Sequence, residues 1–209
     1  MIWSLDIETK NEDISDLDFS NPKGWEISCI CLYNSKNQSF YFVDEYMNTQ
    51  PDAIFRNQPN AYWCRQNFSK FEEWFNRNIV EKEALVVTKN GANFDFPIIE
   101  EFLGIELPYF RHIDLEEYVK MKIGERWRLN EMIAYHLGQD DSKLMDASYA
   151  PRFWNQGFRE IVIGYCLDDC KKTLEVFNDA KDKGKIGRIE GGSIFGRPQH
   201  ILFPTLWSN

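Results

Sequence analysis

Apolar and β-branched runs separated by polar stretches occupy the first quarter of the chain and predict a group of strands. Ile2–Glu8 is a short predicted strand, Trp25–Tyr33 is a longer apolar and β-branched run, and Ser39–Val43 is a further strand. The polar stretch Lys10–Gly24 predicts a loop, and Asn34–Asn37 supplies turn residues. Together these segments predict an antiparallel hairpin or meander.

Helical periodicity marks much of the remaining sequence. Four apolar residues recur at helical spacing and predict an amphipathic helix: Phe68, Phe71, Phe75 and Ile79. Three more helices are predicted over Pro97–Leu103, Leu129–Leu137 and Phe158–Lys183. A glycine follows each of them, at positions 104, 138 and 184, which is typical of a helix C-terminus.

Two short apolar strands are expected between these helices, at Ala84–Thr88 and His112–Leu115. Strands first and strand–helix alternation afterwards indicate an α/β domain with a mixed sheet. Asn48–Asn60 is rich in Pro, Asn and Gln and is expected to be irregular. We expect one domain over residues 1–190 and a tail over residues 191–209, in which glycines and prolines surround an apolar patch.

The composition and net charge of the chain limit how it could bind nucleic acid. Its 209 residues include 43% hydrophobic residues, enough for a full core without disulfides or a structural metal. The 24 basic and 33 acidic residues give a formal net charge of -9, which argues against a broad electrostatic nucleic-acid surface. A nucleic-acid substrate would therefore have to be held locally, in a short groove.

The cysteines are odd in number and lie mostly inside apolar runs: Cys29, Cys31, Cys64, Cys166 and Cys170. We recognise no secretory leader, and no apolar run approaches the roughly 20 residues that a membrane span requires. We therefore expect a cytoplasmic protein with reduced core thiols and no membrane partner. Cys29 and Cys31 could form half of a metal site, but no Cys/His pair follows at zinc-like spacing, which disfavours zinc.

Two acidic motifs lie in the first half of the chain. Asp6 and Glu8 are two residues apart in a predicted strand, so they share a face and could reach one ion pair. Such a pair alone is more often two solvated acids at a strand end. Asp95 follows the predicted strand Ala84–Thr88 across a turn and opens the next helix. A first-turn acid that stabilises the helix is an equally good interpretation of Asp95.

The third motif lies on the longest predicted helix. Tyr165 and Asp169 are four residues apart and share one helix face, whereas Asp168 lies about 100° round the helix from Asp169. Asp169 is therefore the favoured ligand, although an ordinary tyrosine beside a surface acid is the alternative. Four carboxylates brought together by the fold would suit divalent cations, the chemistry of phosphodiester cleavage.

The segments SLDIET, NGANFD and YCLDD, in this order, resemble the three motifs of the DEDD superfamily of 3′-5′ exonucleases, the DnaQ-like group. The resemblance spans Met1–Lys183 and implies a ribonuclease-H-like mixed β-sheet flanked by helices. A tyrosine four residues before the last aspartate marks the DEDDy branch, seen in the proofreading domains of family A and family B DNA polymerases. The histidine branch would need His at the position of Gly164.

This resemblance implies a role for each motif residue. Asp6, Glu8, Asp95 and Asp169 would hold two divalent cations, Mg²⁺ or Mn²⁺, and Tyr165 would orient the attacking water.

Three residues that flank the motifs, Thr9, Asn90 and Phe94, would contact the terminal nucleotide, although Phe94 is as readily explained by core packing. The favoured function is a stand-alone, proofreading-type 3′-5′ exonuclease that releases nucleoside 5′-monophosphates from single-stranded DNA 3′ ends. An exonuclease acting on RNA or short oligonucleotides is the alternative. An inactive nucleic-acid-binding adaptor is disfavoured because the set of four carboxylates and the tyrosine is intact.

The remaining basic, aromatic and histidine residues have two interpretations each. No catalytic role is expected for His112, His136 or His200, and His136 is interpreted as a cation near a helix C-terminus. Basic residues at the end of the longest helix are interpreted as a solvated cap rather than a phosphate track: Lys181, Lys183, Lys185 and Arg188. Arg126, Trp127 and Arg128 either stack on single-stranded bases or place a buried tryptophan under the following helix.

The tail carries a candidate partner motif. Gln199, Leu202 and Phe203 in QHILF match the spacing of short peptides through which bacterial replication proteins bind the sliding clamp, with Gly191–Gly196 as a possible tether. Packing of the tail onto the domain is the alternative. The expected partners are a single-stranded nucleic-acid 3′ end and, through this motif, a sliding clamp or polymerase.

Overall fold

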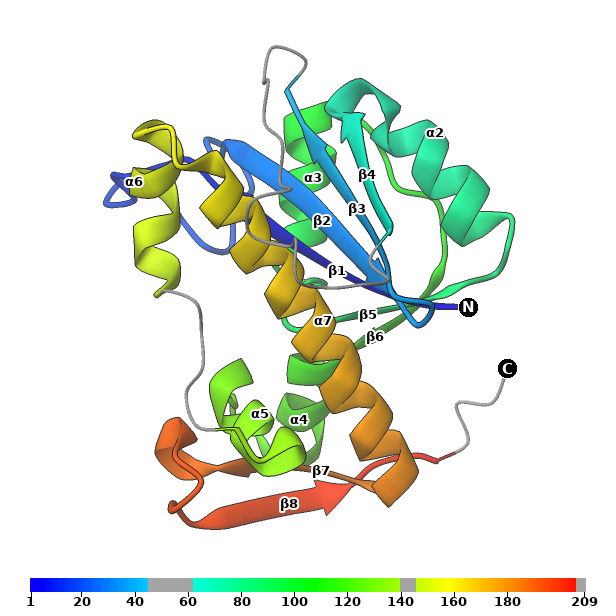
Figure 1. Cartoon of the computed structure of the whole chain (residues 1–209), viewed down its shortest axis with the longest axis vertical. Helices are drawn as coiled ribbons and strands as arrows, with labels where there is room; N and C mark the ends of the chain where they lie inside the picture. The colour runs from blue at the N-terminus through cyan, green and yellow to red at the C-terminus, as the bar shows by residue number, and fades with distance from the viewer. Residues whose placement is uncertain (45–61, 140–145, 206–209) are drawn as a thin grey trace.

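A mixed six-stranded sheet forms the centre of the protein in a computed structural model that describes residues 1–44, 62–139 and 146–205 (Figure 1). Its strands are β1 (Ile2–Thr9), β2 (Ile27–Asn34), β3 (Gln38–Val43), β4 (Tyr62–Asn67), β5 (Leu85–Thr88) and β6 (Arg111–Asp114). They lie in the order β4-β3-β2-β1-β5-β6. The β1–β2 and β2–β3 pairs are antiparallel, whereas β3–β4, β1–β5 and β5–β6 are parallel.

The predicted meander and mixed sheet are confirmed by this topology. The first three strands form an antiparallel meander, and the strands after it alternate with helices. Strand β4 was not predicted, because its residues lack the apolar alternation of a half-buried strand. The segment Asn48–Asn60, expected to be irregular, lies outside the described residues.

Helices cover both faces of the sheet (Figure 1). The helical segments are η1 (Phe68–Lys70), α2 (Phe71–Phe75), the π-helical η2 (Asn76–Val80), α3 (Asp95–Leu103), α4 (Leu115–Ile123), α5 (Leu129–Leu137), η3 (Ala147–Tyr149), α6 (Ala150–Asn155), α7 (Arg159–Lys183) and η4 (Glu190–Gly192). The four predicted helices are present, and three end at the expected glycines in left-handed conformation, with φ of 65°, 64° and 64° at Gly104, Gly138 and Gly184. Within the described ranges, none of these helices has the length and apolar character needed to traverse a membrane.

Alternation along β1 decides which side chains face which layer. Trp3, Leu5 and Ile7 belong to the core that α2 and α3 share with the sheet. Their neighbours on the opposite face, including Asp6 and Glu8, face α7. The sheet therefore sorts the apolar residues of β1 to one side and its two acids to the other.

A two-stranded antiparallel hairpin follows α7. Its strands are β7 (Lys185–Ile189) and β8 (Pro198–Leu202), which lie below α4 and α5 in Figure 1. Phe203, directly after β8, is 3% exposed and packs edge-on against Tyr118 at a ring-centroid distance of 4.9 Å. The tail expected from residue 191 thus contributes a strand and a core aromatic to the packed structure and does not hang free as far as Phe203.

His136 ties this hairpin to α7. Its Nδ1 lies 2.7 Å from Asp179 Oδ2, and its Nε2 accepts a hydrogen bond from the Gly187 backbone N–H at 3.0 Å. Because Nε2 accepts, the ring is neutral with its proton on Nδ1, and burial lowers the pKa of His136 against the opposing effect of Asp179. The interpretation of His136 as a cation near a helix C-terminus is therefore wrong.

Candidate functional site

A cleft of about 930 Å³ opens where the end of β1, the turn after β5 and the middle of α7 meet. It is lined by every residue that the sequence predicted for catalysis, metal binding or nucleotide contact: Asp6, Glu8, Thr9, Asn90, Phe94, Asp95, Tyr165 and Asp169. The structure therefore brings the three motifs to one place. The individual roles of these residues remain predictions.

Asp6 and Glu8 reach the cleft from the end of β1. The pairing of β1 with β2 shifts register between Glu8 and Thr9, an irregularity of the kind that redirects side chains at strand ends. A carboxylate oxygen of each acid and Cys166 Sγ of α7 lie within 4.8 Å of one another. The first and third motifs are therefore in direct contact.

Asp95 enters the same region as the first residue of α3. It is 4% exposed, and its Oδ1 accepts a hydrogen bond of 3.0 Å from the Ile7 backbone N–H, between the two acids of β1. The pKa of the Asp95 carboxyl is raised from 3.8 to about 7, chiefly by burial; the hydrogen bond from the Ile7 N–H opposes this rise, and the nearby Asp114 charge adds to it. A cation beside Asp95 would offset the cost of ionising it.

The turn before α3 is held by Asp114, a buried acid that the sequence reasoning missed. Its carboxylate accepts hydrogen bonds from the backbone N–H groups of Asn90 at 2.9 Å and Ala92 at 3.0 Å, and it caps α4 by accepting from Glu116 N at 2.9 Å. The D-x-x-E pattern of residues 114–117 is a capping-box signature and could have identified this role.

Asn90 itself has an unusual backbone. Its φ is 72°, a left-handed conformation that few residues other than glycine adopt. Among the described residues, its Oδ1 is buried beside the cleft with no hydrogen-bond partner. Asn90 therefore combines a strained backbone with an unsatisfied side-chain acceptor at the position predicted to contact a nucleotide.

Tyr165 and Asp169 face the cleft from one side of α7. Tyr165 is 1% exposed, and its pKa is raised by burial first and then by the charges of Asp169, Glu8 and Asp6. Its hydroxyl therefore stays protonated at neutral pH. Asp168 lies outside the cleft lining and pairs with Lys172 at 2.6 Å, so the placement of the two adjacent acids agrees with the predicted helical register.

An aromatic wall stands beside the acids. Phe94 packs edge-on against Trp25 and in a stacked arrangement against Phe19, with ring centroids 5.1 and 5.9 Å apart. Phe19 is 61% exposed and also lines the cleft. Phe94 thus takes part in packing and in the cleft surface, whereas Phe19, inside a loop expected to be merely polar, was missed.

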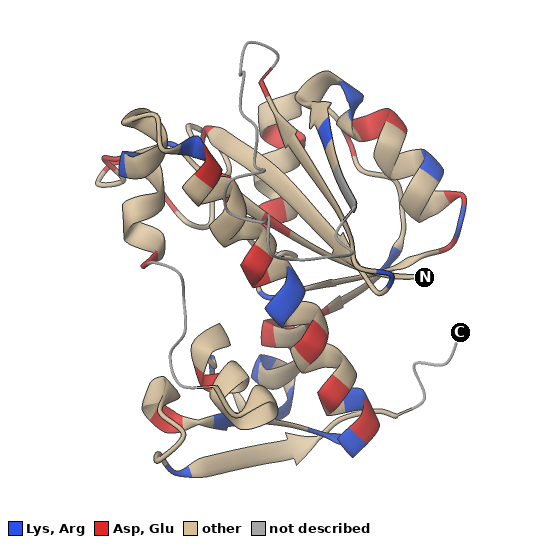
Figure 2. Ribbon diagram, in the orientation of Figure 1, with Lys and Arg blue, Asp and Glu red and all other residues tan. Residues whose placement is uncertain are grey.

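Arg126, Trp127 and Arg128 have three different environments. Trp127 is 1% exposed in the core, so the base-stacking role considered for it is wrong and the burial alternative is confirmed. Arg126 pairs with Glu116 at 3.2 Å, whereas Arg128 is exposed and lines the cleft. Acidic and basic residues are interspersed along α7 (Figure 2). Near the end of this helix, Lys183 pairs with Asp179 at 2.7 Å.

The residues of the predicted clamp motif do not line the described cleft. Gln199 Oε1 accepts a hydrogen bond from Arg188 Nε at 2.9 Å, Leu202 is 83% exposed and Phe203 is buried. Seating both apolar side chains in a partner's pocket would require Phe203 to leave the core. Clamp binding remains an untested prediction that this packing disfavours.

Comparison with known proteins places the chain in a family. A family model described as the RNase H superfamily matches residues 5–180, so the chain belongs to that superfamily. RNase H-like folds are typically nucleases that use divalent metal ions, which fits the acidic cluster in the cleft. No curated protein matches the chain.

The solved structures similar to it include the family B DNA polymerase from the hyperthermophilic archaeon Pyrobaculum calidifontis, with a TM-score of 0.57 and 17% sequence identity. The match covers 85% of this chain and 24% of that polymerase, so the chain spans about a quarter of its length. At this identity the likeness concerns the fold.

Proposed function

We propose that this member of the RNase H superfamily is a metal-dependent 3′-5′ exonuclease that releases nucleoside 5′-monophosphates from single-stranded DNA 3′ ends. The observation that carries the proposal is the convergence of three acidic motifs, from β1, the start of α3 and the middle of α7, on one cleft. The likeness in fold to a family B DNA polymerase agrees with the proofreading-type resemblance of these motifs.

The donor set of the cleft fits divalent cations. Asp6, Glu8, Asp95 and Asp169 present carboxylate oxygens, which hard cations such as Mg²⁺ and Mn²⁺ prefer. Crowded carboxylates repel one another, and burial raises the pKa of Asp95, so bound cations would offset the cost of ionising this site. Two bound ions would stabilise charge on the attacking and leaving oxygens of a phosphodiester.

Tyr165 would act as a hydroxyl donor and not as a base. Its raised pKa keeps the proton on Oη at neutral pH, among the carboxylates of Asp169, Glu8 and Asp6. A fixed O–H group in this position can hold a water molecule in line with the scissile phosphate, which lowers the entropic cost of attack.

The walls of the cleft would hold the terminal nucleotide. Phe19 and Phe94 offer an aromatic surface on which a base can stack, an interaction worth about 1–3 kcal/mol per base. The Thr9 hydroxyl and the unsatisfied Asn90 Oδ1 can contact the sugar or base, and exposed Arg128 supplies positive charge for a phosphate. Local contacts of this kind suit a chain whose net charge is -9.

The proposal is tested by digesting 5′-end-labelled single-stranded DNA, duplex DNA and RNA of one sequence with Mg²⁺ or Mn²⁺ and resolving product length over time. Asp169→Ala should lower the rate by at least about 100-fold, the order that misplacing reacting groups costs. Asp168→Ala is the matched control, since Asp168 pairs with Lys172 outside the cleft lining and its loss should leave the rate unchanged.

Polarity is tested with blocked ends. A 3′-phosphate should stop digestion and circular single-stranded DNA should resist it, because the cleft would have to seat a free terminal nucleotide. Comparable cleavage of circular DNA would indicate an endonuclease and contradict the proposal. Digestion of RNA but not of DNA would assign the alternative substrate.

A further inference from the structure

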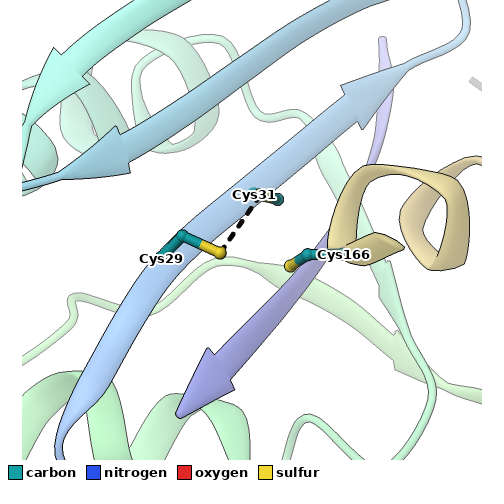
Figure 3. A group of neighbouring side chains, drawn as sticks. All are labelled: Cys29, Cys31 and Cys166. Atoms are coloured by element: carbon teal, nitrogen blue, oxygen red, sulfur yellow. Dashed lines mark hydrogen bonds between the residues drawn. The ribbon is translucent and has the colours of Figure 1, made fainter. Parts of the chain in front are cut away.

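Three buried thiols meet between β2 and α7. Cys29 and Cys31 alternate along β2 and point to the same face of the sheet, where Cys166 of α7 lies opposite them (Figure 3). Their Sγ atoms lie within 4.8 Å of one another, and those of Cys29 and Cys31 are 3.9 Å apart. All three residues are 0% exposed.

We propose that these three thiols form a binding site for one thiophilic divalent cation of the zinc group. Zinc–thiolate bonds are about 2.3 Å long, so two sulfur atoms bound to one tetrahedral ion lie about 3.8 Å apart. The Sγ atoms of Cys29 and Cys31 are 3.9 Å apart, and that of Cys166 lies within 4.8 Å of both. As each sulfur–metal bond forms, the thiol loses its proton to the solvent. Thiolate is the ligand that soft cations select.

The thiol site is distinct from the carboxylate cluster but lies directly behind it. Cys166 Sγ is 3.6 Å from Asp6 Oδ2, and Asp6 lines the cleft. The oxygen ligands of the cleft suit harder cations than the thiols do, so the two clusters would select different ions. The inference does not depend on nuclease activity, because binding at sulfur can be measured without a substrate.

Cys170 offers a matched control on the same helix. It is also buried, but its Sγ points to the Cys31 carbonyl oxygen at 3.4 Å, and it is not one of the three mutually close thiols. Loss of Cys170 removes a buried thiol of the same layer without removing a proposed ligand. Cys64, partly buried on β4, controls for reactive thiols elsewhere.

The test titrates Cd²⁺ into the reduced, full-length protein with excess Mg²⁺ present to occupy the carboxylates. Sulfur-to-cadmium charge-transfer absorption and equilibrium dialysis should report one bound ion per chain. Cys31→Ala and Cys166→Ala should each weaken binding by at least about 10-fold, since even loss of a residue that only orients a ligand can cost that much. Cys170→Ala and Cys64→Ala should bind as the wild type does.

Circular dichroism of each variant checks folding, and Cys31→Ser, which changes only sulfur to oxygen, replaces any alanine variant that does not fold. Absence of the sulfur-linked absorption in the wild-type protein would show that the thiols only pack the core and would overturn the proposal. Retention of the absorption in Cys31→Ala would assign it to Asp6, Glu8 and Cys166 and would overturn it equally.

Discussion

Replacing Asp95 with asparagine should stabilise the metal-free protein while it removes a proposed metal ligand. The Asp95 carboxyl is 4% exposed, and burial raises its pKa from 3.8 to about 7. An acid whose pKa is raised by folding favours the native state when protonated. Its contribution is therefore fully present below pH 3.8 and is lost as the pH rises to about 7.

The size of the effect follows from the two pKa values. Each tenfold change in proton affinity is worth about 1.36 kcal/mol, so ionised Asp95 costs the fold about 4 kcal/mol above pH 7. Between pH 5 and pH 8 the wild-type protein should lose about 3 kcal/mol through this residue. Asparagine carries no charge and removes this loss, less about 1 kcal/mol for a weaker acceptor opposite the Ile7 N–H.

Urea unfolding with a chelator at pH 5 and pH 8 measures the effect for both proteins. Subtracting the pH-dependent change of one from that of the other cancels the remaining titrating groups and should leave about 3 kcal/mol. Added Mg²⁺ should stabilise the wild type at pH 8 and have little effect on Asp95→Asn. Equal pH dependence in the two proteins would refute the electrostatic reasoning.

Asp114→Asn is the matched control for this experiment. Asp114 is similarly buried, but its carboxylate accepts hydrogen bonds from Asn90, Ala92 and the first turn of α4. Its replacement should lower the unfolding free energy at both pH values, since a carboxylate that caps a helix and holds a turn is lost. The contrast separates an acid whose ionisation destabilises the fold, Asp95, from one whose hydrogen bonds stabilise it, Asp114.

Tyr165→Phe should slow hydrolysis by up to about 100-fold without weakening Mn²⁺ binding, as measured by single-turnover assays and metal titration; an unchanged rate would remove its proposed role. Phe203→Ala should cost about 3–5 kcal/mol in urea unfolding because it empties a core position, whereas Leu202→Ala, at 83% exposure, should change stability by less than about 0.5 kcal/mol. Because folding lowers the pKa of His136, this residue contributes to stability above about pH 6.5, and the contribution is lost at lower pH, where the unfolded chain binds the proton more readily. His136→Gln should therefore weaken the pH dependence of the unfolding free energy in that range.

Local periodicity was enough to place the acids on the right faces. Alternation along β1 predicted that Asp6 and Glu8 share a face, and helical spacing predicted that Asp169 and not Asp168 accompanies Tyr165. These predictions succeed because the direction of a side chain depends on its own strand or helix. The glycines that follow three of the four predicted helices fix the ends of those helices for the same local reason.

Segments whose structure depends on a distant partner were misjudged or missed. The basic residues of β7 resembled a helix cap, yet Arg188 pairs with Glu125 at 3.0 Å and the strand pairs with β8. Neither strand has enough apolar residues to be recognised alone, and the hairpin is held by Phe203 in the core and by His136. The structure of β7 and β8 is thus determined by the residues they pack against and not by their own sequence pattern.

The thiol cluster also depends on a distant partner, which explains why sequence spacing did not identify it as a candidate metal site. Local alternation places Cys29 and Cys31 on one face of β2. The third thiol comes from α7, which is distant in sequence, and no local pattern predicts how α7 packs across the sheet. Cys166 is one turn from Cys170 and directly follows Tyr165, so its helix face could be read only as core. Once α7 is docked with Tyr165 and Asp169 in the cleft, Cys166 must lie beside Asp6 and the two cysteines of β2. The docking that would assemble the carboxylates for hydrolysis therefore also brings the three thiols together.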